Sequence, residues 1–202
     1  MAGMLASATI ADLLRPCEKR RAALYDITLI IGGSLLIGLC AQVKVLLPFS
    51  PVPITAQTFA VLMIGTLLGS WRGSLCVLTY IVQGVAGLPV FALGGGFAVL
   101  IGPTGGYLVG FVPAAYITGL LAQKGWDRRI VTTILAMVLG NIVIYAFGLL
   151  WLCCLMGINR AVPAVGLYPF VVGDLLKIAL AAAVLPAGWK LLEYAGLAGK
   201  NE

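Results

Sequence analysis

Residues 130–154 read IVTTILAMVLGNIVIYAFGLLWLCC, and no charged side chain interrupts this run. A helix that crosses the hydrocarbon core of a bilayer needs about 20 predominantly apolar residues. The whole chain shares this character, because 61% of its 202 residues are hydrophobic and only 10% are charged. Soluble domains typically carry about 25% charged residues. The sequence therefore predicts an all-α integral membrane protein.

Further apolar runs lie on both sides of residues 130–154, and proline, glycine or charged residues separate them. Each run has about the length that a bilayer requires, and the second and third runs are the shortest. The sequence predicts six transmembrane helices, at residues 26–47, 52–70, 72–88, 104–122, 130–154 and 169–189.

The basic residues are distributed unevenly over the predicted connections. If both termini are cytoplasmic, ten of the 13 Lys and Arg residues face the cytoplasm, Lys44 and Arg160 fall in outer loops, and Lys177 lies within the last span. An excess of Lys and Arg in cytoplasmic loops is the rule for membrane proteins. We therefore predict a multi-pass protein of the plasma (inner) membrane with cytoplasmic N and C termini. The same asymmetry explains the net charge of +6 without a nucleic-acid partner.

The chain divides into three predicted regions. Residues 1–25 are polar and basic and lack the apolar segment of a cleavable signal peptide, so we expect a cytoplasmic N-terminal arm. Residues 26–192 are predicted to form the six-helix membrane domain that lies in the lipid bilayer. Residues 193–202 are predicted to form a cytoplasmic C-terminal tail.

Several kinds of chemistry find no support in this sequence. Histidine is absent, which excludes histidine-based acid–base catalysis and histidine-ligated metal sites. The five cysteines have no metal-ligand spacing, and no G-x-x-x-x-G-K-[ST] phosphate loop occurs. We therefore expect no enzyme, no cofactor and no metal site. If this protein uses ATP, another subunit must supply the ATPase site.

Two opposite charges lie inside the last predicted span, in YPFVVGDLLK at residues 168–177. Asp174 and Lys177 are three residues apart and therefore share one face of a helix. A lone charge at the centre of a membrane costs on the order of 2.5–3.5 kcal/mol on the lenient insertion scale. Because a polar ligand would offset this cost, we interpret the pair as the base of a small-molecule site. The alternatives are a lock between helices, a lysine that extends to the membrane surface, or a misplaced span.

Polar and aromatic side chains of the neighbouring spans are candidates for the same site. Gln83 lies near the outer end of the third span, and Asn141 lies near the middle of the fifth. A buried amide needs a partner, which is either another helix or a ligand. Aromatic residues near the membrane surface are otherwise typical interface anchors. Further candidates begin the second span (Thr55, Gln57) or provide aromatic walls (Tyr80, Phe91, Tyr107, Tyr168).

The predicted outer loops are apolar and rich in proline and glycine. The second loop includes GLPVFALGGGFAVLIGPTGGY at residues 87–107, which carries no charge. Loops that merely face water are usually polar, so we predict that this one folds back as a lid. Gly95 and Gly96 would allow its backbone to approach a ligand closely. The alternative is a stiff connector at the level of the lipid headgroups.

Small residues at intervals of four mark faces on which helices approach one another closely. Ser34 and Gly38 have this spacing in the first span, where they either pack within the protein or dock another membrane protein. A longer row runs through the fourth span and the loop before it, at Gly102, Gly106, Gly110 and Ala114.

Four motifs together carry a resemblance to a known family. PVPITAQTFAVLMIGTLLG, GLPVFALGGG, GPTGGYLVGF and PFVVGDLLK occur in the order and spacing of the BioY family, the biotin-specific substrate-binding (S) components of energy-coupling-factor (ECF) transporters. The sequence resembles this family from about residue 26 to residue 190. The resemblance implies a six-helix subunit that captures biotin from outside. It also implies partners, namely an ECF module of a transmembrane coupling protein and two ATPases.

The resemblance also implies roles for individual residues. Asp174 and Lys177 are similar to the Asp and Lys of the family's last helix. We expect both to contact the ureido end of biotin; the alternative for Lys177 is that it balances the carboxylate. Ser34 and Gly38 are similar to the small residues through which the family's first helix contacts the coupling protein. The alternative function is a solitary, proton-coupled secondary transporter of a small vitamin-like solute, in which Asp174 would carry the proton.

Overall fold

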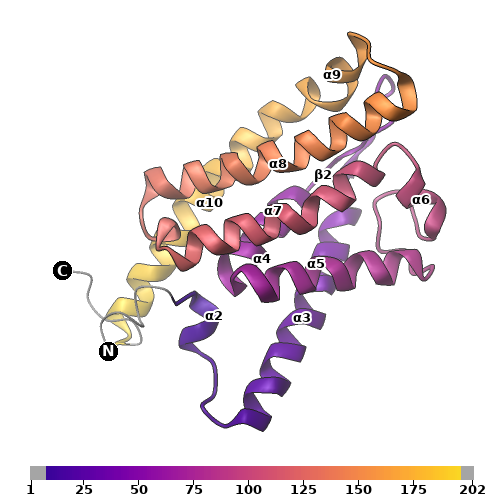
Figure 1. Ribbon diagram of the computed structural model, residues 1–202. Coiled ribbons are helices and arrows are strands. Elements are labelled where there is room, and N and C mark those ends of the chain that lie inside the picture. Colours follow the sequence, from indigo (N-terminus) through magenta and orange to yellow (C-terminus); the bar gives the residue numbers. More distant parts are fainter. Residues whose placement is uncertain (1–7, 197–202) are drawn as a thin grey trace.

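Long helices, joined by short connections, make up most of residues 8–196, which are the residues that the computed structural model describes (Figure 1). The first seven residues of the predicted arm and the last six of the predicted tail lie outside this range. The main helices are α3 (Lys19–Gln42), α4 (Gln57–Leu68), α5 (Ser70–Val85), α7 (Gly105–Gln123), α8 (Ile130–Met156) and α10 (Tyr168–Tyr194). Between them lie α2 (Ile10–Leu13), β1 (Lys44–Val45), β2 (Ile54–Thr55), α6 (Phe97–Ile101), η1 (Trp126–Arg128) and α9 (Ala161–Gly166).

The prediction of an all-α membrane protein is confirmed. Four helical segments in residues 8–196 are long and apolar enough to cross a membrane: α3, α7, α8, and α10 together with α9 before it. The second predicted span is shorter than expected, since α4 has 12 residues and extends only about 18 Å at 1.5 Å per residue. Residues 43–56 instead form a hairpin in which β1 pairs with β2. Pro51 and Pro53 favour this, because proline lacks the N–H that a helix interior requires.

Helix α7 lies at the centre of the bundle and packs against α4, α5 and α8. The predicted row of small residues lies at its contact with α8. A Cβ atom built on Gly106 would approach the Cβ of Trp151 to 2.2 Å, and one on Gly110 would approach the Cβ of Phe147 to 2.9 Å. Only glycine therefore permits this helix separation, and the row serves packing within the protein.

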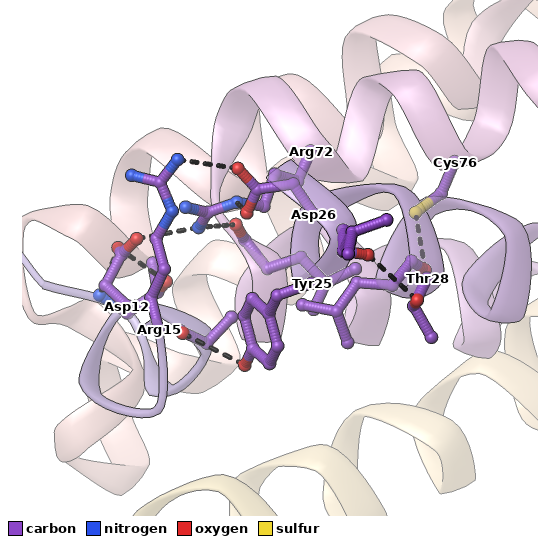
Figure 2. Close-up of polar contacts among 12 residues, drawn as sticks. Asp12, Arg15, Tyr25, Asp26, Thr28, Arg72 and Cys76 are labelled. Carbon is purple, nitrogen blue, oxygen red and sulfur yellow. Dashed lines mark hydrogen bonds and ion pairs between the residues drawn. The ribbon is translucent and has the colours of Figure 1, made fainter. Parts of the chain in front are cut away.

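One end of the bundle holds α2, the start of α3 and the last turns of α10 (Figure 1). Arg72, at the start of α5, binds two carboxylates there (Figure 2). Its Nη1 lies 2.6 Å from Asp12 of α2, and its Nε lies 2.8 Å from Asp26 of α3. Arg15 adds a second ion pair to Asp26 at 2.7 Å. Part of the predicted arm is thereby attached to the bundle, and α3 already begins within it at Lys19.

The opposite end holds the hairpin, α6 and α9 (Figure 1). Side chains bind these segments to one another through backbone carbonyl groups. The hydroxyl of Ser50 donates to the carbonyl of Val165 at 2.7 Å, and the hydroxyl of Tyr107 donates to the carbonyl of Gly166 at 2.7 Å. Phe91 packs edge-on against Tyr80, with ring centroids 5.4 Å apart. The hairpin is thereby joined to α9, while Tyr107 of α7 and Tyr80 of α5 contact α9 and the loop before α6. Together these segments form a cap over this end of the bundle.

Candidate functional site

A cavity lies beneath this cap, and it contains about 590 Å³ of space that protein atoms do not fill. Residues from the hairpin, from the loop between α5 and α7, and from helices α4, α7, α8 and α10 form its wall. They are Val52, Pro53, Thr55, Gln57, Thr58, Phe91, Ala92, Leu93, Val99, Thr104, Tyr107, Leu108, Phe111, Ile144, Tyr145, Phe170, Asp174 and Lys177.

The charged part of the cavity is built on α10, where Asp174 and Lys177 point the same way because they are one helical turn apart. The ammonium of Lys177 donates to Asp174 Oδ1 at 3.0 Å and to Thr58 Oγ1 of α4 at 2.8 Å. The hydroxyl of Tyr145 on α8 donates to the other oxygen, Asp174 Oδ2. Asp174 is only 5% exposed, so this carboxylate depends on its protein partners rather than on water.

The remainder of the wall is mainly apolar and aromatic. Phe91, Ala92 and Leu93 come from the outer loop that was predicted to form a lid, and they lie against the cavity. At the start of α4, the side-chain amide of Gln57 donates to the hydroxyl of Tyr80, which fixes both groups. This arrangement can hold a compact, largely apolar molecule and can offer one carboxylate acceptor and one ammonium donor to its polar end.

Two predicted amides do not line this cavity. Gln83 donates from Nε2 to Ser34 Oγ at 3.2 Å, so it connects α5 to α3. Asn141 lines a separate space of about 190 Å³, together with Thr58, Lys177 and others. That space lies about one helical turn further from the cap, because Asn141 precedes Tyr145 in α8 by four residues and Ile178 follows Asp174 in α10 by four.

Three further predicted residues lie outside the cavity wall. Gly95 and Gly96 shape the loop, because a Cβ on Gly95 would approach the Leu88 carbonyl oxygen to 2.4 Å and Gly96 adopts a φ of +99°. The N–H of Gly96 donates to the carbonyl of Gly84 at 2.7 Å. Tyr168, in the first turn of α10, is 65% exposed.

Ser34 and Gly38 face the interior of the molecule. Ser34 is fully buried against α5, and a Cβ on Gly38 would lie 3.3 Å from the Cβ of Val90. As the structure places them, both residues pack within the chain. The outward side of α3 instead carries larger side chains such as Leu35 and Leu39, which are 49% and 68% exposed.

Sequence reasoning missed Tyr145 and Thr58, which contact the ion pair directly. A signal existed for both. Tyr145 lies one turn after Asn141 in α8, and Thr58 follows Gln57 at the start of α4. Neither stood out, because a hydroxyl in an apolar span costs little and often bonds within its own helix.

No group of three or more His, Cys, Asp or Glu side chains in residues 8–196 is placed to hold a metal ion.

The sequence also matches a family model. Residues 15–194 match the model of the BioY family, which is most of the chain. The chain belongs to the BioY family.

Named relatives and a solved structure agree with this membership. The chain is 42% identical over 139 residues to the biotin transporter BioY of Thermotoga maritima, covering 68% of this chain and 81% of that one. It is 39% identical over 170 residues to the biotin transporter BioY of Rhodobacter capsulatus, covering 74% and 88%. The fold is similar to the crystal structure of the S-component for biotin from an ECF-type ABC transporter, with a TM-score of 0.75, 24% identity, and coverage of 86% and 95%.

Proposed function

We propose that this chain captures biotin with high affinity as the S component of an ECF-type transporter and so serves biotin uptake. The observation that carries the proposal is the ion pair of Asp174 and Lys177 at the wall of an otherwise apolar cavity. Biotin matches that wall, because it has a polar ureido ring, an apolar thioether ring and an apolar tail. Membership of a family whose named members are biotin transporters supports the same ligand.

In the proposed complex, the ureido group lies against α10. Its N–H groups donate to the carboxylate of Asp174, and its oxygen accepts from the ammonium of Lys177. Both protein groups can do this without losing all their present partners, since a carboxylate has about four acceptor sites and an ammonium has three donors. Tyr145 and Thr58 would then hold the pair in position while the ligand occupies the remaining sites.

We propose that the chain crosses the plasma membrane six times, with α4 and α5 as the short second and third spans. Both termini would then lie in the cytoplasm. The bundle end that carries α2 is then cytoplasmic, and the cap and the cavity face outward. ATP hydrolysis would come from two ATPases joined through a transmembrane coupling protein. Helix α3 would present its outward side to that protein, with Ser34 packed against α5 and Gly38 packed against Val90 of the following loop.

The experiment is equilibrium binding of radiolabelled biotin to the purified chain, with thiamine and riboflavin as competitors. The proposal predicts saturable binding with one site per chain that unlabelled biotin displaces and the other two vitamins do not. Absence of saturable biotin binding by folded protein, or equal displacement by thiamine, would overturn it.

A further inference from the structure

Lys44, in the first strand of the outer hairpin, lies beside the cavity without forming part of its wall. Its cross-strand partner in the β1–β2 pair is Thr55, which lines the cavity. Its ammonium donates to the backbone carbonyl of Ala92, which also lines the cavity and belongs to the capping loop. The side chain is otherwise exposed, on the outer surface of the molecule. Lys44 therefore places a positive charge where the hairpin and the capping loop meet over the cavity.

A ligand with a carboxylate would need a positively charged partner besides the ion pair of the cavity wall. Asp174 and Lys177 are the charged residues of the wall, and they neutralise each other. The described outer connections, residues 43–56, 86–104 and 157–167, contain two basic residues, Lys44 and Arg160. Arg160 precedes α9 and does not line the cavity, and no contact between it and the capping loop is observed.

This inference rests on the proposed function, since it concerns the second polar end of the same ligand. We propose that Lys44 is a specificity-determining residue that recognises the carboxylate of the ligand's tail at the outer mouth of the cavity. An ammonium has three N–H donors, so Lys44 can bind a carboxylate while it keeps the Ala92 carbonyl. Recognition of the tail and attachment of the loop would then occur at one side chain.

Gln42 provides the comparison that separates charge from loop attachment. It lies at the end of α3, two residues before Lys44, and its amide nitrogen donates to the carbonyls of Pro89 at 3.2 Å and Phe91 at 3.4 Å. Gln42 thus fastens the same loop with a neutral group. Loss of either residue should loosen the loop, but only loss of Lys44 should remove the positive charge.

The test compares biotin with biotinamide, in which a neutral amide replaces the carboxylate. We expect Lys44→Met to weaken biotin binding about tenfold, the factor that 1.4 kcal/mol represents, and to change biotinamide binding less than about threefold. Lys44→Arg should restore most of the affinity for biotin. Gln42→Leu should change the affinities for both ligands by the same factor. A thermal melt of each purified variant shows that it is folded.

Salt provides a second readout, because exposed charges are screened over about 8 Å at physiological ionic strength. Biotin affinity of the unmodified protein should fall as salt rises, and that of Lys44→Met should not. If Lys44→Met loses the same factor of affinity for biotin and for biotinamide, Lys44 only holds the loop in place, and the inference is overturned. It is also overturned if Lys44→Met loses no affinity for either ligand. If the unmodified protein binds neither ligand, the proposed function itself fails.

Discussion

Replacing Lys177 with methionine tests what the buried ion pair does for the fold and for the ligand separately. The substitution keeps much of the side-chain volume but leaves Asp174, which is 5% exposed, without its cationic partner 3.0 Å away. Two unit charges at that distance attract each other by about 5 kcal/mol at an effective dielectric constant of about 20. Removing one partner of a buried pair typically costs about 3–5 kcal/mol, because an uncompensated charge remains.

The matched variant is the double substitution Asp174→Asn with Lys177→Met, which removes both charges. Replacement of a whole buried pair by neutral groups is often nearly neutral for stability. We therefore expect the free energy of unfolding to fall by about 3 kcal/mol or more in the single variant and to recover most of that loss in the double variant. Both variants should bind biotin at least about tenfold more weakly, since each lacks a group that the ureido ring requires.

The assay is thermal and denaturant unfolding in detergent, together with biotin binding on the same preparations. If the double variant is no more stable than the single one, the stranded charge is not the cause of the loss. If the double variant binds biotin as well as the unmodified protein does, the pair serves the fold alone, and the reasoning about the site is refuted.

Three further substitutions test other parts of the structure. Burial raises the pKa of Asp127 from 3.8 to about 6, so the stability that its protonated form provides is present at low pH and is lost as pH rises between these two values. Asp127→Asn should therefore raise the free energy of unfolding by about 3 kcal/mol at pH 7. Melts at about pH 4 should show little difference between this variant and the unmodified protein. Gly106→Ala should cost about 1–3 kcal/mol in the same melts, because its Cβ would lie 2.2 Å from the Cβ of Trp151, whereas Gly32→Ala, with no atom within 4 Å, should cost almost nothing. Arg72→Met should lower the free energy of unfolding by about 1–2 kcal/mol at low salt, because it removes the ion pairs to Asp12 and Asp26. This loss should shrink in high salt, because salt screens partly exposed ion pairs.

Apolar runs and small-residue spacing were enough to predict most of the helices, because both reflect requirements that act locally along the chain. The ends of α7 and α8 agree with the predicted spans to within two residues. The first and second spans differed more, since α3 is Lys19–Gln42 and not residues 26–47, and α4 begins at Gln57 and not at residue 52. Apolar character alone does not distinguish a helix from an apolar hairpin, and here the prolines and the pairing of β1 with β2 decide the structure.

The site was only partly visible in the sequence for a different reason. Asp174 and Lys177 stood out because charges inside a span are costly, and the structure brings both to the cavity. Gln83 suggested ligand binding and Ser34 suggested docking of another membrane protein, but the amide nitrogen of Gln83 donates to Ser34 between α5 and α3. The choice between a ligand and a neighbouring helix depends on how two helices are rotated against each other. One sequence does not contain that information.

The most direct test of the central claim is the affinity of Asp174→Asn for biotin, measured at equilibrium with a melt to show that the variant is folded. The substituted amide would keep the size of the side chain but could offer the ureido N–H groups only one neutral acceptor. With two charge-assisted hydrogen bonds weakened, the account predicts a loss of about a hundredfold in affinity. An affinity within about twofold of that of the unmodified protein would contradict the account, because the ligand would then not depend on the carboxylate of the last helix.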